Sequence, residues 1–254
     1  MTEGLFNRTE LLLGADAMEK VRQKRVIIFG TGGVGSWCAE CLVREGIRRL
    51  TLVDSDVVCT TNCNRQLMAT TVTIGQPKTE ALRSRLLEIN PEADIIALQR
   101  NFSRETAGDF HLHEYDYIID AIDSLRDKIE LIIKATDTEG GSGPILFSSM
   151  GAALRIDPTR VKVSEFWKVK GDPLAAAMRS AMRRHKQFPA CKFLCVHSEE
   201  PPLPNIGTAL EDGSQTMGKK QTNGSLCHIT AIFGMTLAGL VIQDIRRKGT
   251  AAPA

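Results

Sequence analysis

Three features are missing from this sequence of 254 residues: a second C-x-x-C motif, a leader-like apolar segment and an excess of charge of one sign. The seven cysteines are odd in number and irregularly spaced, so we expect no four-cysteine zinc site. The first residues, MTEGLFNRTELLLG, include acids and no apolar run of signal-peptide length. These two absences favour free thiols and a cytoplasmic location. The net charge of +2 excludes a polycation, although basic residues can still cluster locally.

The composition is that of an ordinary globular protein, with 43% hydrophobic and 24% charged residues. It excludes wholesale disorder and a protein with many membrane spans. A chain of this length is expected to form one large domain, or one domain with an appendage.

Apolar strands and amphipathic helices alternate through residues 1–155. We expect the strands at 26–29, 50–53, 94–98, 115–123 and 145–150, and the helices at 8–23, 36–45, 76–89 and 127–136. Strand–helix–strand units imply parallel pairing with right-handed crossovers. The pattern predicts an α/β fold with a Rossmann-like doubly wound sheet.

Residues 156–254 are expected to complete the same fold. They contain an alternating strand at 160–169 and a basic helix at 173–188. Residues 197–224 are rich in Pro, Gly and polar side chains, which is typical of a mobile functional loop. The apolar run 226–245 has the length of a membrane span. Its internal polar residues favour a buried helix at a subunit interface over peripheral membrane association.

A glycine-rich loop directly follows the first expected strand and opens a helix. Gly30-Thr31-Gly32-Gly33-Val34-Gly35 matches G-x-G-x-x-G. Glycines allow a tight turn and close approach to phosphate oxygens, and the helix N-terminus adds free N–H groups. Asp54, at the end of the second strand, lies where a ribose-binding acid is expected. In isolation these residues indicate a nucleotide phosphate site and fit a nicotinamide enzyme equally well.

Charged residues beyond Asp54 favour a different chemistry. Arg65 and Lys78 follow the second strand, and Asp120-x-x-Asp123 ends the strand at 115–123. An enzyme that cleaves ATP between the α- and β-phosphates needs cations there, because charge builds on the phosphate oxygens during transfer. A carboxylate at this edge could hold Mg²⁺, which takes one or two carboxylates together with phosphate and water.

The ordered motifs G-x-G-G-x-G-S, D-x-D, N-x-N-R-Q, G-x-P-K and D-x-x-D resemble the ubiquitin-activating-enzyme-like superfamily over residues 5–155. The resemblance implies that residues 1–155 form an ATP-binding adenylation domain in a homodimer that uses Mg-ATP. It implies that Asp54 holds the ribose, that Asn62, Arg65 and Lys78 contact the phosphates, and that Asp123 is the Mg²⁺ ligand. It also implies that Arg8 reaches the partner subunit's ATP. The complete ATP site implied in this way is Gly30, Gly32, Gly33, Gly35, Ser36, Asp54, Asp56, Asn62, Arg65, Gln66, Lys78 and Asp123.

Within the superfamily, three segments are similar to a branch that acts on tRNA. These are FNRTELLLG, FSSMGAALRIDPTRV and NGSLCHITAIFG. The resemblance implies ATP-dependent cyclisation of threonylcarbamoyladenosine in tRNA, and it implies a sulfur-relay cysteine desulfurase and its acceptor as further partners.

Three other functions stay open. They are activation of a sulfur-carrier protein ending in Gly-Gly, nicotinamide-dependent oxidoreduction, and a non-catalytic nucleotide scaffold. The missing C-x-x-C pairs count against the first, and Arg65, Lys78 and Asp123 count against the others. Because relatives form thioesters, a catalytic role also stays open for Cys191, Cys195 or Cys227. The default for a buried thiol is that of a small hydrophobe.

The segment 160–192 is strongly basic. It holds nine Lys and Arg residues against Glu165 and Asp172, for a net charge of +7. This asymmetry predicts contact with an RNA backbone, through Arg179, Arg183, Arg184 and Lys186. The aromatic residues inside the segment, which could stack on unpaired bases, are Phe166, Trp167 and Phe188.

Overall fold

The computed structural model describes residues 4–137, 143–207 and 223–250. Within them, one sheet has the strand order β3-β2-β1-β4-β5-β7-β6. The strands are β1 (Arg25–Phe29), β2 (Arg49–Val53), β3 (Asp94–Leu98), β4 (Tyr117–Asp120), β5 (Ile145–Ser149), β6 (Val161–Glu165) and β7 (Leu194–Ser198). The helices are α1 (Asn7–Leu13), α2 (Ala15–Gln23), α3 (Gly35–Arg44), α4 (Lys78–Ile89), α5 (Leu125–Thr136), α6 (Pro173–His185) and α7 (Cys227–Thr250).

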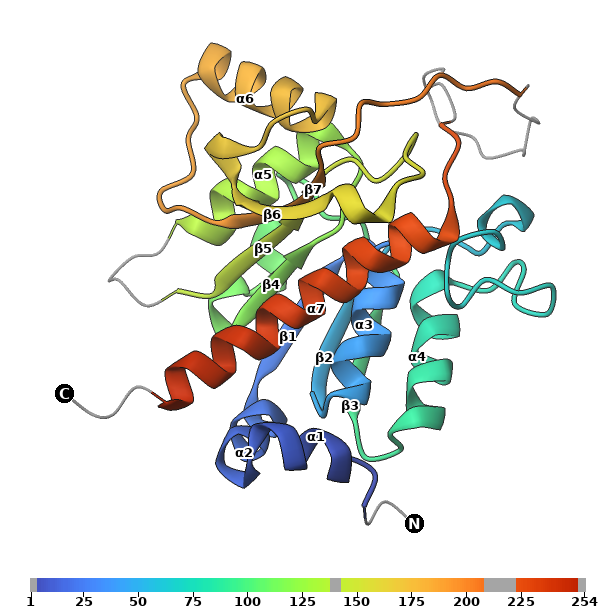
Figure 1. Cartoon of the computed structure of the whole chain (residues 1–254), viewed down its shortest axis with the longest axis vertical. Helices are drawn as coiled ribbons and strands as arrows, with labels where there is room; N and C mark the ends of the chain where they lie inside the picture. The colour runs from blue at the N-terminus through green and yellow to red at the C-terminus, as the bar shows by residue number, and fades with distance from the viewer. Residues whose placement is uncertain (1–3, 138–142, 208–222, 251–254) are drawn as a thin grey trace.

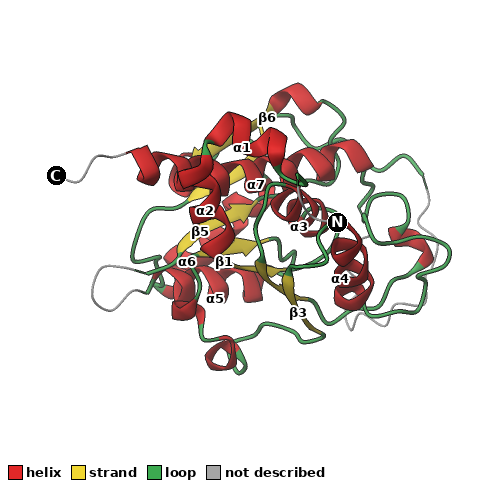
Figure 2. Ribbon diagram, turned by 90° about the horizontal axis from the view of Figure 1, so that it is seen from below, coloured by secondary structure: helices red, strands yellow, loops and turns green. Residues whose placement is uncertain are grey.

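Side chains along each central strand alternate between two separate cores. In β1, Val26 and Ile28 pack in the core formed with α3, α4 and α7. Ile27 and Phe29 of the same strand pack in the core formed with α5 and α6. The two helical layers therefore lie on opposite faces of the sheet, as Figures 1 and 2 show. A strand buried on both faces needs apolar residues throughout, which explains the continuous run in β1.

The strand order reverses at β1, and this reversal positions the candidate site. β1 pairs in parallel with β2 on one side and with β4 on the other. In open α/β sheets, such a switch point opens a crevice at the carboxyl ends of the strands. Gly30, Asp54 and Ala121 follow β1, β2 and β4, so the glycine loop and both acidic motifs meet there. The expected Rossmann-like α/β fold is confirmed.

Several element boundaries differ from the expectations. The helix expected at 8–23 is two helices, because Gly14 between them has φ of 84° and ψ of 158°. The strand expected at 115–123 is shorter in the structure, where β4 covers Tyr117–Asp120 alone. Asp123 therefore lies beyond the end of the strand. Within 160–169 the chain leaves the sheet after Glu165 and forms a 3₁₀ turn at Phe166–Lys168.

Strand β7 was not expected from the sequence. It pairs in parallel with β5 and antiparallel with β6 at the edge of the sheet. The loop expected at 197–224 therefore begins at Glu199, and residues 208–222 lie outside the described part of the chain. The division of the chain at residue 155 stays a prediction, although β6, β7 and α7 share the sheet and cores of the first half.

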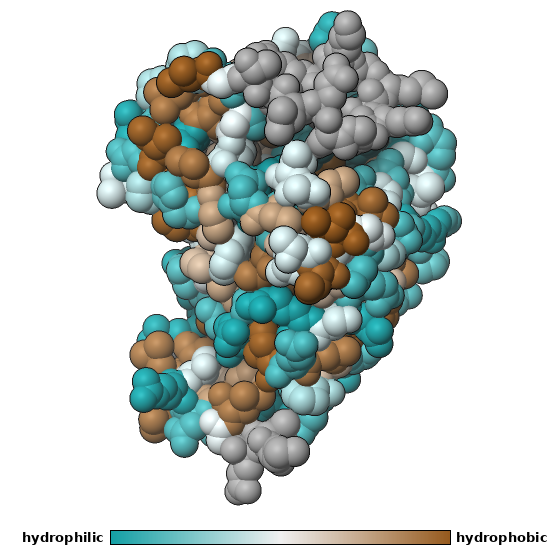
Figure 3. Space-filling model, turned by 90° about the vertical axis from the view of Figure 1, so that its right-hand side faces the viewer, coloured by the Kyte–Doolittle hydropathy of each residue, from teal (hydrophilic) through white to brown (hydrophobic). Residues whose placement is uncertain are grey.

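Helix α7 crosses the sheet beside α3 (Figure 1). Its segment Cys227–Lys248 is long and apolar enough to pass for a membrane span, and it is the one such helix in the described residues. Its apolar side chains, Ile229, Phe233, Leu237 and Val241, are fully buried in the core with α3. On the face seen in Figure 3, apolar side chains lie in small patches between hydrophilic ones. The length and hydropathy of α7 are thus explained by burial in this fold.

Glu45 gives a test of this packing by pH. It caps the C-terminus of α3, where a negative charge is unfavourable, and its buried Oε2 has no hydrogen-bond partner. Burial raises the pKa of Glu45 to about 7. The folded state therefore binds this proton more tightly than the unfolded state, and stability falls as pH rises from the ordinary carboxyl pKa through 7.

We expect Glu45→Gln to stabilise the protein at pH 8 by on the order of 2 kcal/mol, and by much less at pH 5. Urea unfolding at both pH values measures the difference. The exposed Glu88→Gln variant on α4 is the matched control. An equal effect of Glu45→Gln at both pH values would show that Glu45 does not titrate in this window.

Candidate nucleotide-binding site

The glycine loop is packed too tightly for any side chain at two of its positions. Gly30 has φ of +87°, and a Cβ there would lie 2.6 Å from the Ala121 carbonyl oxygen after β4. A Cβ on Gly35 would lie 1.9 Å from the Gly30 carbonyl oxygen. Both neighbours are backbone atoms that cannot move aside cheaply. The loop is thereby held between β4 and the first turn of α3.

The residues that lead into α3 carry free backbone donors. The amides of Gly32, Gly33 and Val34 make no hydrogen bond within the described residues, and α3 has no side-chain cap. Unpaired amides and the helix dipole favour an anion at this point. Among the described residues, the one atom within 4 Å of a Cβ built on Gly32 is Gln66 Nε2, at 3.7 Å. A phosphate can therefore approach the Gly32 backbone. This cradle fits the phosphates of a nucleotide.

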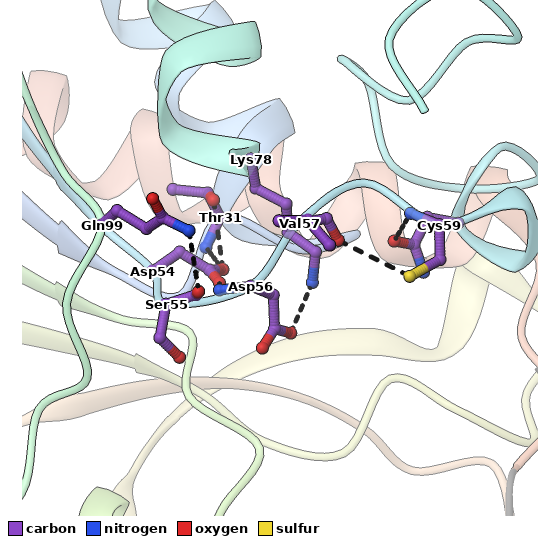
Figure 4. Close-up of polar contacts among 9 residues, drawn as sticks. Thr31, Asp54, Ser55, Asp56, Val57, Cys59, Lys78 and Gln99 are labelled. Atoms are coloured by element: carbon purple, nitrogen blue, oxygen red, sulfur yellow. Dashed lines mark hydrogen bonds and ion pairs between the residues drawn. The ribbon is translucent and has the colours of Figure 1, made fainter. Parts of the chain in front are cut away.

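Asp54 lies against the glycine loop, as Figure 4 shows. Its Oδ2 accepts hydrogen bonds from the Thr31 amide at 2.7 Å and from the Thr31 hydroxyl at 3.1 Å. Its Oδ1 accepts the Asp56 amide at 3.0 Å. The carboxylate is thus fixed between β1 and β2, at the position where a ribose-binding acid is expected.

Lys78 is a largely buried cation at the start of α4. Its side chain is 8% exposed, and its Nζ lies 2.7 Å from Oδ2 of the exposed Asp56. The Lys78 amide also donates to the Asp56 carbonyl oxygen at 3.0 Å. The D-x-D and G-x-P-K motifs therefore meet in space, and Figure 4 shows Lys78 reaching towards the loop after β2. The ion pair holds the ammonium group at the crevice.

Residues 59–67 pack beside the start of α3, and we call them the wall of the site. Ser36 Oγ donates to the Gly32 carbonyl oxygen at 2.7 Å and accepts the Leu67 amide at 3.2 Å, which joins the wall to the glycine loop. Trp37 Nε1 donates to the Arg65 carbonyl oxygen at 3.1 Å. Gln66 is buried, and its Oε1 has no hydrogen-bond partner.

Two motif residues in this wall have internal partners. The Asn62 Oδ1 accepts the Cys59 amide at 3.0 Å, so this side chain shapes the 3₁₀ turn Thr60–Asn62. Arg65 Nη1 donates to the Thr61 carbonyl oxygen and to Asn64 Oδ1, each at 2.9 Å. The guanidinium group is only partly buried.

The two acids of D-x-x-D have different environments. Asp120 is fully buried with Lys128, whose Nζ lies 2.9 Å from Asp120 Oδ2. Ser148 Oγ donates to the same oxygen at 2.7 Å. Asp123, three residues on, is exposed in the turn after β4. Asp120 is therefore engaged inside the fold, and Asp123 is the carboxylate that a metal ion at this edge could reach.

Arg8 lies near the amino ends of the strands, whereas the glycine loop lies at their carboxyl ends. It is exposed on α1, and α2 leads directly into the amino end of β1. Phe6 approaches Gly46, which precedes β2 at that same edge. The length of β1 separates this edge from the loop by about 16 Å. Arg8 therefore cannot complete the site of its own chain.

The cysteines divide into buried and exposed thiols. Cys38 and Cys41 lie on α3 against the core, and burial raises the pKa of Cys38 and raises that of Cys41 to about 11. Cys195 is fully buried, and burial raises its pKa as well. A raised pKa disfavours the thiolate that a nucleophile or a metal ligand requires. Cys191 and Cys227 are exposed, and their proposed roles stay open.

The structure adds residues that the motif analysis missed. Thr31, an unspecified position of the glycine motif, holds Asp54. Thr230 on α7 closes the other side of the loop, because a Cβ on Gly33 would lie 3.1 Å from its side chain. Gly234 lets α7 approach, since a Cβ there would lie 2.3 Å from the Val34 carbonyl oxygen. No local signal in the sequence links α7 to a loop so distant in the chain.

A profile of the ThiF family matches residues 6–251. The chain belongs to the ThiF family. This membership agrees with the resemblance in the glycine, D-x-D, N-x-N-R-Q, G-x-P-K and D-x-x-D motifs.

Similarity to individual ThiF-family proteins extends along nearly the whole chain. The tRNA threonylcarbamoyladenosine dehydratase of Bacillus subtilis is 34% identical over 247 residues, covering 94% of each chain. A crystal structure of the Escherichia coli tRNA N6-threonylcarbamoyladenosine dehydratase in complex with ATP has a TM-score of 0.83 and 30% identity, covering 98% of this chain and 96% of that one. The sulfur carrier protein ThiS adenylyltransferase of E. coli is 31% identical over 128 residues, only 50% of this chain and 51% of its own.

Proposed function

We propose that this protein is an ATP-dependent dehydratase that cyclises threonylcarbamoyladenosine in tRNA. The observation that carries the proposal is the end-to-end similarity to the B. subtilis enzyme of that name. The similarity to the ThiS adenylyltransferase stops at half of each chain. The ATP complex of the E. coli enzyme supports ATP as the nucleotide for the glycine-loop cradle.

The proposed chemistry begins at the free carboxylate of the threonylcarbamoyl group. Hydroxide is a poor leaving group, so the carboxylate first attacks the α-phosphorus of ATP and pyrophosphate departs. The resulting mixed anhydride carries AMP as a good leaving group. The ureido part of the same modification then attacks the activated carbonyl, the ring closes and AMP is released. Both reacting groups belong to one nucleotide, so their effective concentration is high.

This sequence of steps assigns positioning and charge stabilisation to the protein rather than a nucleophile. The free amides of the glycine loop and the Ser36 end of α3 would hold phosphate oxygens, and Asp54 and Asp56 would face the ribose side. Asn62, Arg65, Gln66 and Lys78 would line the phosphates, where Arg65 and Lys78 counter the charge that develops during adenylation. The unpaired Oε1 of Gln66 supports a ligand in the crevice, because a buried polar atom without a partner is rare.

Asp123 is our candidate for the magnesium ligand. It is exposed at the carboxyl end of β4, and one carboxylate together with phosphate and water is a usual Mg²⁺ environment. The ion would neutralise charge on the departing pyrophosphate. A homodimer in which Arg8 contacts the partner subunit's ATP is also part of the proposal, supported by the distance of Arg8 from its own crevice. The cytoplasmic location and a sulfur-relay partner stay predictions.

The decisive experiment is ATP–pyrophosphate exchange with Mg²⁺, comparing tRNA that carries threonylcarbamoyladenosine with tRNA that lacks it. We expect exchange and AMP release only with the modified tRNA, and loss of the mass of one water from the nucleoside. If ATP binds while modified tRNA stimulates nothing, the proposed substrate is wrong. A carrier protein ending in Gly-Gly would then be the substrate to test.

The basic end of α6 gives a separate prediction. We expect the triple variant Arg183→Ala, Arg184→Ala and Lys186→Ala to weaken tRNA binding by about 10–100-fold at low salt, because phosphate contacts dominate such affinity. ATP affinity should not change. The matched control removes three other exposed charges, at Lys20, Arg126 and Lys248. Unchanged tRNA affinity in the first variant, or an equal loss in the control, would contradict this assignment.

A further inference from the structure

Two aromatic side chains meet on the surface beside the C-terminal end of α6. Trp167 belongs to the 3₁₀ turn Phe166–Lys168, and Phe188 follows α6. Their ring centroids are 6.1 Å apart, and the residues are 37% and 52% exposed. Phe166 lies beneath Trp167 at 5.2 Å and is fully buried, so it belongs to the core rather than to the surface. Trp167 is thus supported from below by Phe166, and both outer rings are partly open to solvent.

Positive charge lies close to the pair along the chain, and acids in the same segment do not balance it. The guanidinium carbon of Arg183 lies 5.6 Å above the Trp167 ring. Asp172, the one acid between residues 166 and 192, is buried and accepts the Ala175 amide as the N-cap of α6. The exposed cations nearby in the sequence have no ion pair within the described residues, and they are Lys168, Lys170, Arg184, Lys186 and Lys192.

The arrangement is fixed in advance by backbone contacts. Lys186 adopts φ of 54° and ends α6, which turns the chain so that Phe188 returns towards Trp167. Arg179 Nη1 donates to the Phe166 carbonyl oxygen at 3.0 Å and ties the 3₁₀ turn to α6. The Ala190 amide donates to Thr136 Oγ1 at 3.1 Å and fixes the following segment to α5. A preformed surface loses little conformational entropy when it binds.

Arg179 differs from its basic neighbours, because its guanidinium group is used inside the fold. Arg160 and Lys162 are also engaged, with Glu199. The basic segment 160–192 is therefore not one continuous surface. Its cations that make no ion pair within the described residues lie close in the chain to the two exposed rings.

This surface is remote from the nucleotide crevice. Asp172 Oδ2 accepts the Gly151 amide at 3.0 Å, which places the start of α6 at the carboxyl end of β5. The 13 residues of α6 then run away from that edge, over about 20 Å. A ligand that reaches both places must be extended and must carry negative charge along its length.

We propose that Trp167 and Phe188 stack on an unpaired base of the tRNA, at a nucleotide other than the one that reacts. Arg183 and the neighbouring lysines bind the flanking phosphates. This inference rests on the proposed function for the identity of the RNA. Planar rings inside a field of uncompensated cations are what single-stranded RNA requires, because bases stack on aromatic side chains while phosphates need cations. An acidic protein would satisfy the charge but would not require two exposed aromatic rings beside it.

The test separates stacking from apolar contact by two substitutions at one position. Trp167→Phe keeps a ring, whereas Trp167→Leu keeps apolar bulk without one. We expect Trp167→Leu and Phe188→Leu to weaken binding of an unmodified tRNA transcript by about 10-fold, and Trp167→Phe to bind nearly as the parent does. None of these three variants should change the slope of log affinity against log salt, since no phosphate contact is lost, whereas Arg183→Ala should lower the slope by about one.

Fluorescence gives a direct readout of stacking. The chain has two tryptophans, so titrating the parent and the Trp167→Phe variant with the same transcript isolates the Trp167 signal. We expect quenching of Trp167 by the tRNA transcript and none by a fully paired RNA duplex. Circular dichroism and the unfolding midpoint of each variant identify any loss that comes from misfolding.

Three results would overturn the inference. They are tRNA affinity of Trp167→Leu and Phe188→Leu equal to that of the parent, no fluorescence change with the transcript, or stronger binding of poly-glutamate than of RNA. The last would identify a docking surface for an acidic protein. Because the transcript is unmodified and no ATP is added, these outcomes do not depend on the dehydration reaction, which the exchange experiment tests separately.

Discussion

Replacing Lys128 with methionine is expected to destabilise the folded protein by about 3–5 kcal/mol, because it leaves a buried carboxylate without its counter-charge. Lys128 and Asp120 are both fully buried, with Nζ 2.9 Å from Oδ2. The Lys128 ammonium group also donates to the Ile122 carbonyl oxygen at 3.0 Å. The remaining contacts of Asp120, from Ser148 Oγ and from the Ile122 amide at 3.2 Å, cannot replace a full positive charge.

The double variant Asp120→Asn with Lys128→Met supplies the control. Asparagine removes the charge and retains groups that can hydrogen-bond to Ser148 and Ile122, so it should recover a large part of the loss. The free energies of unfolding in urea for the parent, both single variants and the double variant close a double-mutant cycle. A loss below about 1 kcal/mol for Lys128→Met would mean that the carboxylate is neutral or hydrated in the folded protein.

The pair also connects the core to the candidate site. Lys128 fixes the Ile122 carbonyl oxygen, and the neighbouring Ala121 carbonyl oxygen faces Gly30. Asp123 follows directly in the same turn. Loss of the pair should therefore weaken ATP binding in addition to lowering stability. A variant with lower stability but unchanged ATP affinity would show that the turn holds its position without Lys128.

The sequence predicted the central fold well because its signals are local. Continuous apolar runs mark β1 and β4, which are buried on both faces, and the glycine loop marks the passage from β1 to α3. Strand β7 was missed because its pairing partners, β5 and β6, lie far away in the chain. Pairing of that kind leaves no periodic signal in a single sequence.

The candidate site shows the same division. The order of the motifs identified its residues, but not their contacts with one another. Lys78 pairs with Asp56 across the loop after β2, and Asp120 pairs with Lys128 in the first turn of α5, at spacings that no motif specifies. The charge of segment 160–192 was evident from composition, whereas its concentration around two exposed rings depends on which cations α6 and Glu199 engage.

Replacing Lys78 with methionine is expected to lower the rate of adenylation by about 100–1000-fold, the usual cost of removing one group that stabilises transition-state charge. Methionine preserves most of the buried volume of a side chain that is 8% exposed, so the fold should persist. Pyrophosphate exchange with modified tRNA measures the rate, and the exposed Lys20→Met variant is the matched control. A loss smaller than about 10-fold would remove Lys78 from the proposed set.

The same variant tests whether Arg8 acts across a homodimer. Arg8→Ala and Lys78→Met chains should each be weakly active alone, because every site then lacks one of its cations. After subunits are mixed in equal amounts, half of the dimers are hybrids, and one of the two sites in each hybrid contains both native residues. Activity should therefore recover to about a quarter of the parent value. If affinity-tagged subunits verify hybrid dimers and no activity returns, Arg8 does not serve the partner's site. Recovery would follow directly from the position of α1, at the edge of the sheet opposite its own glycine loop.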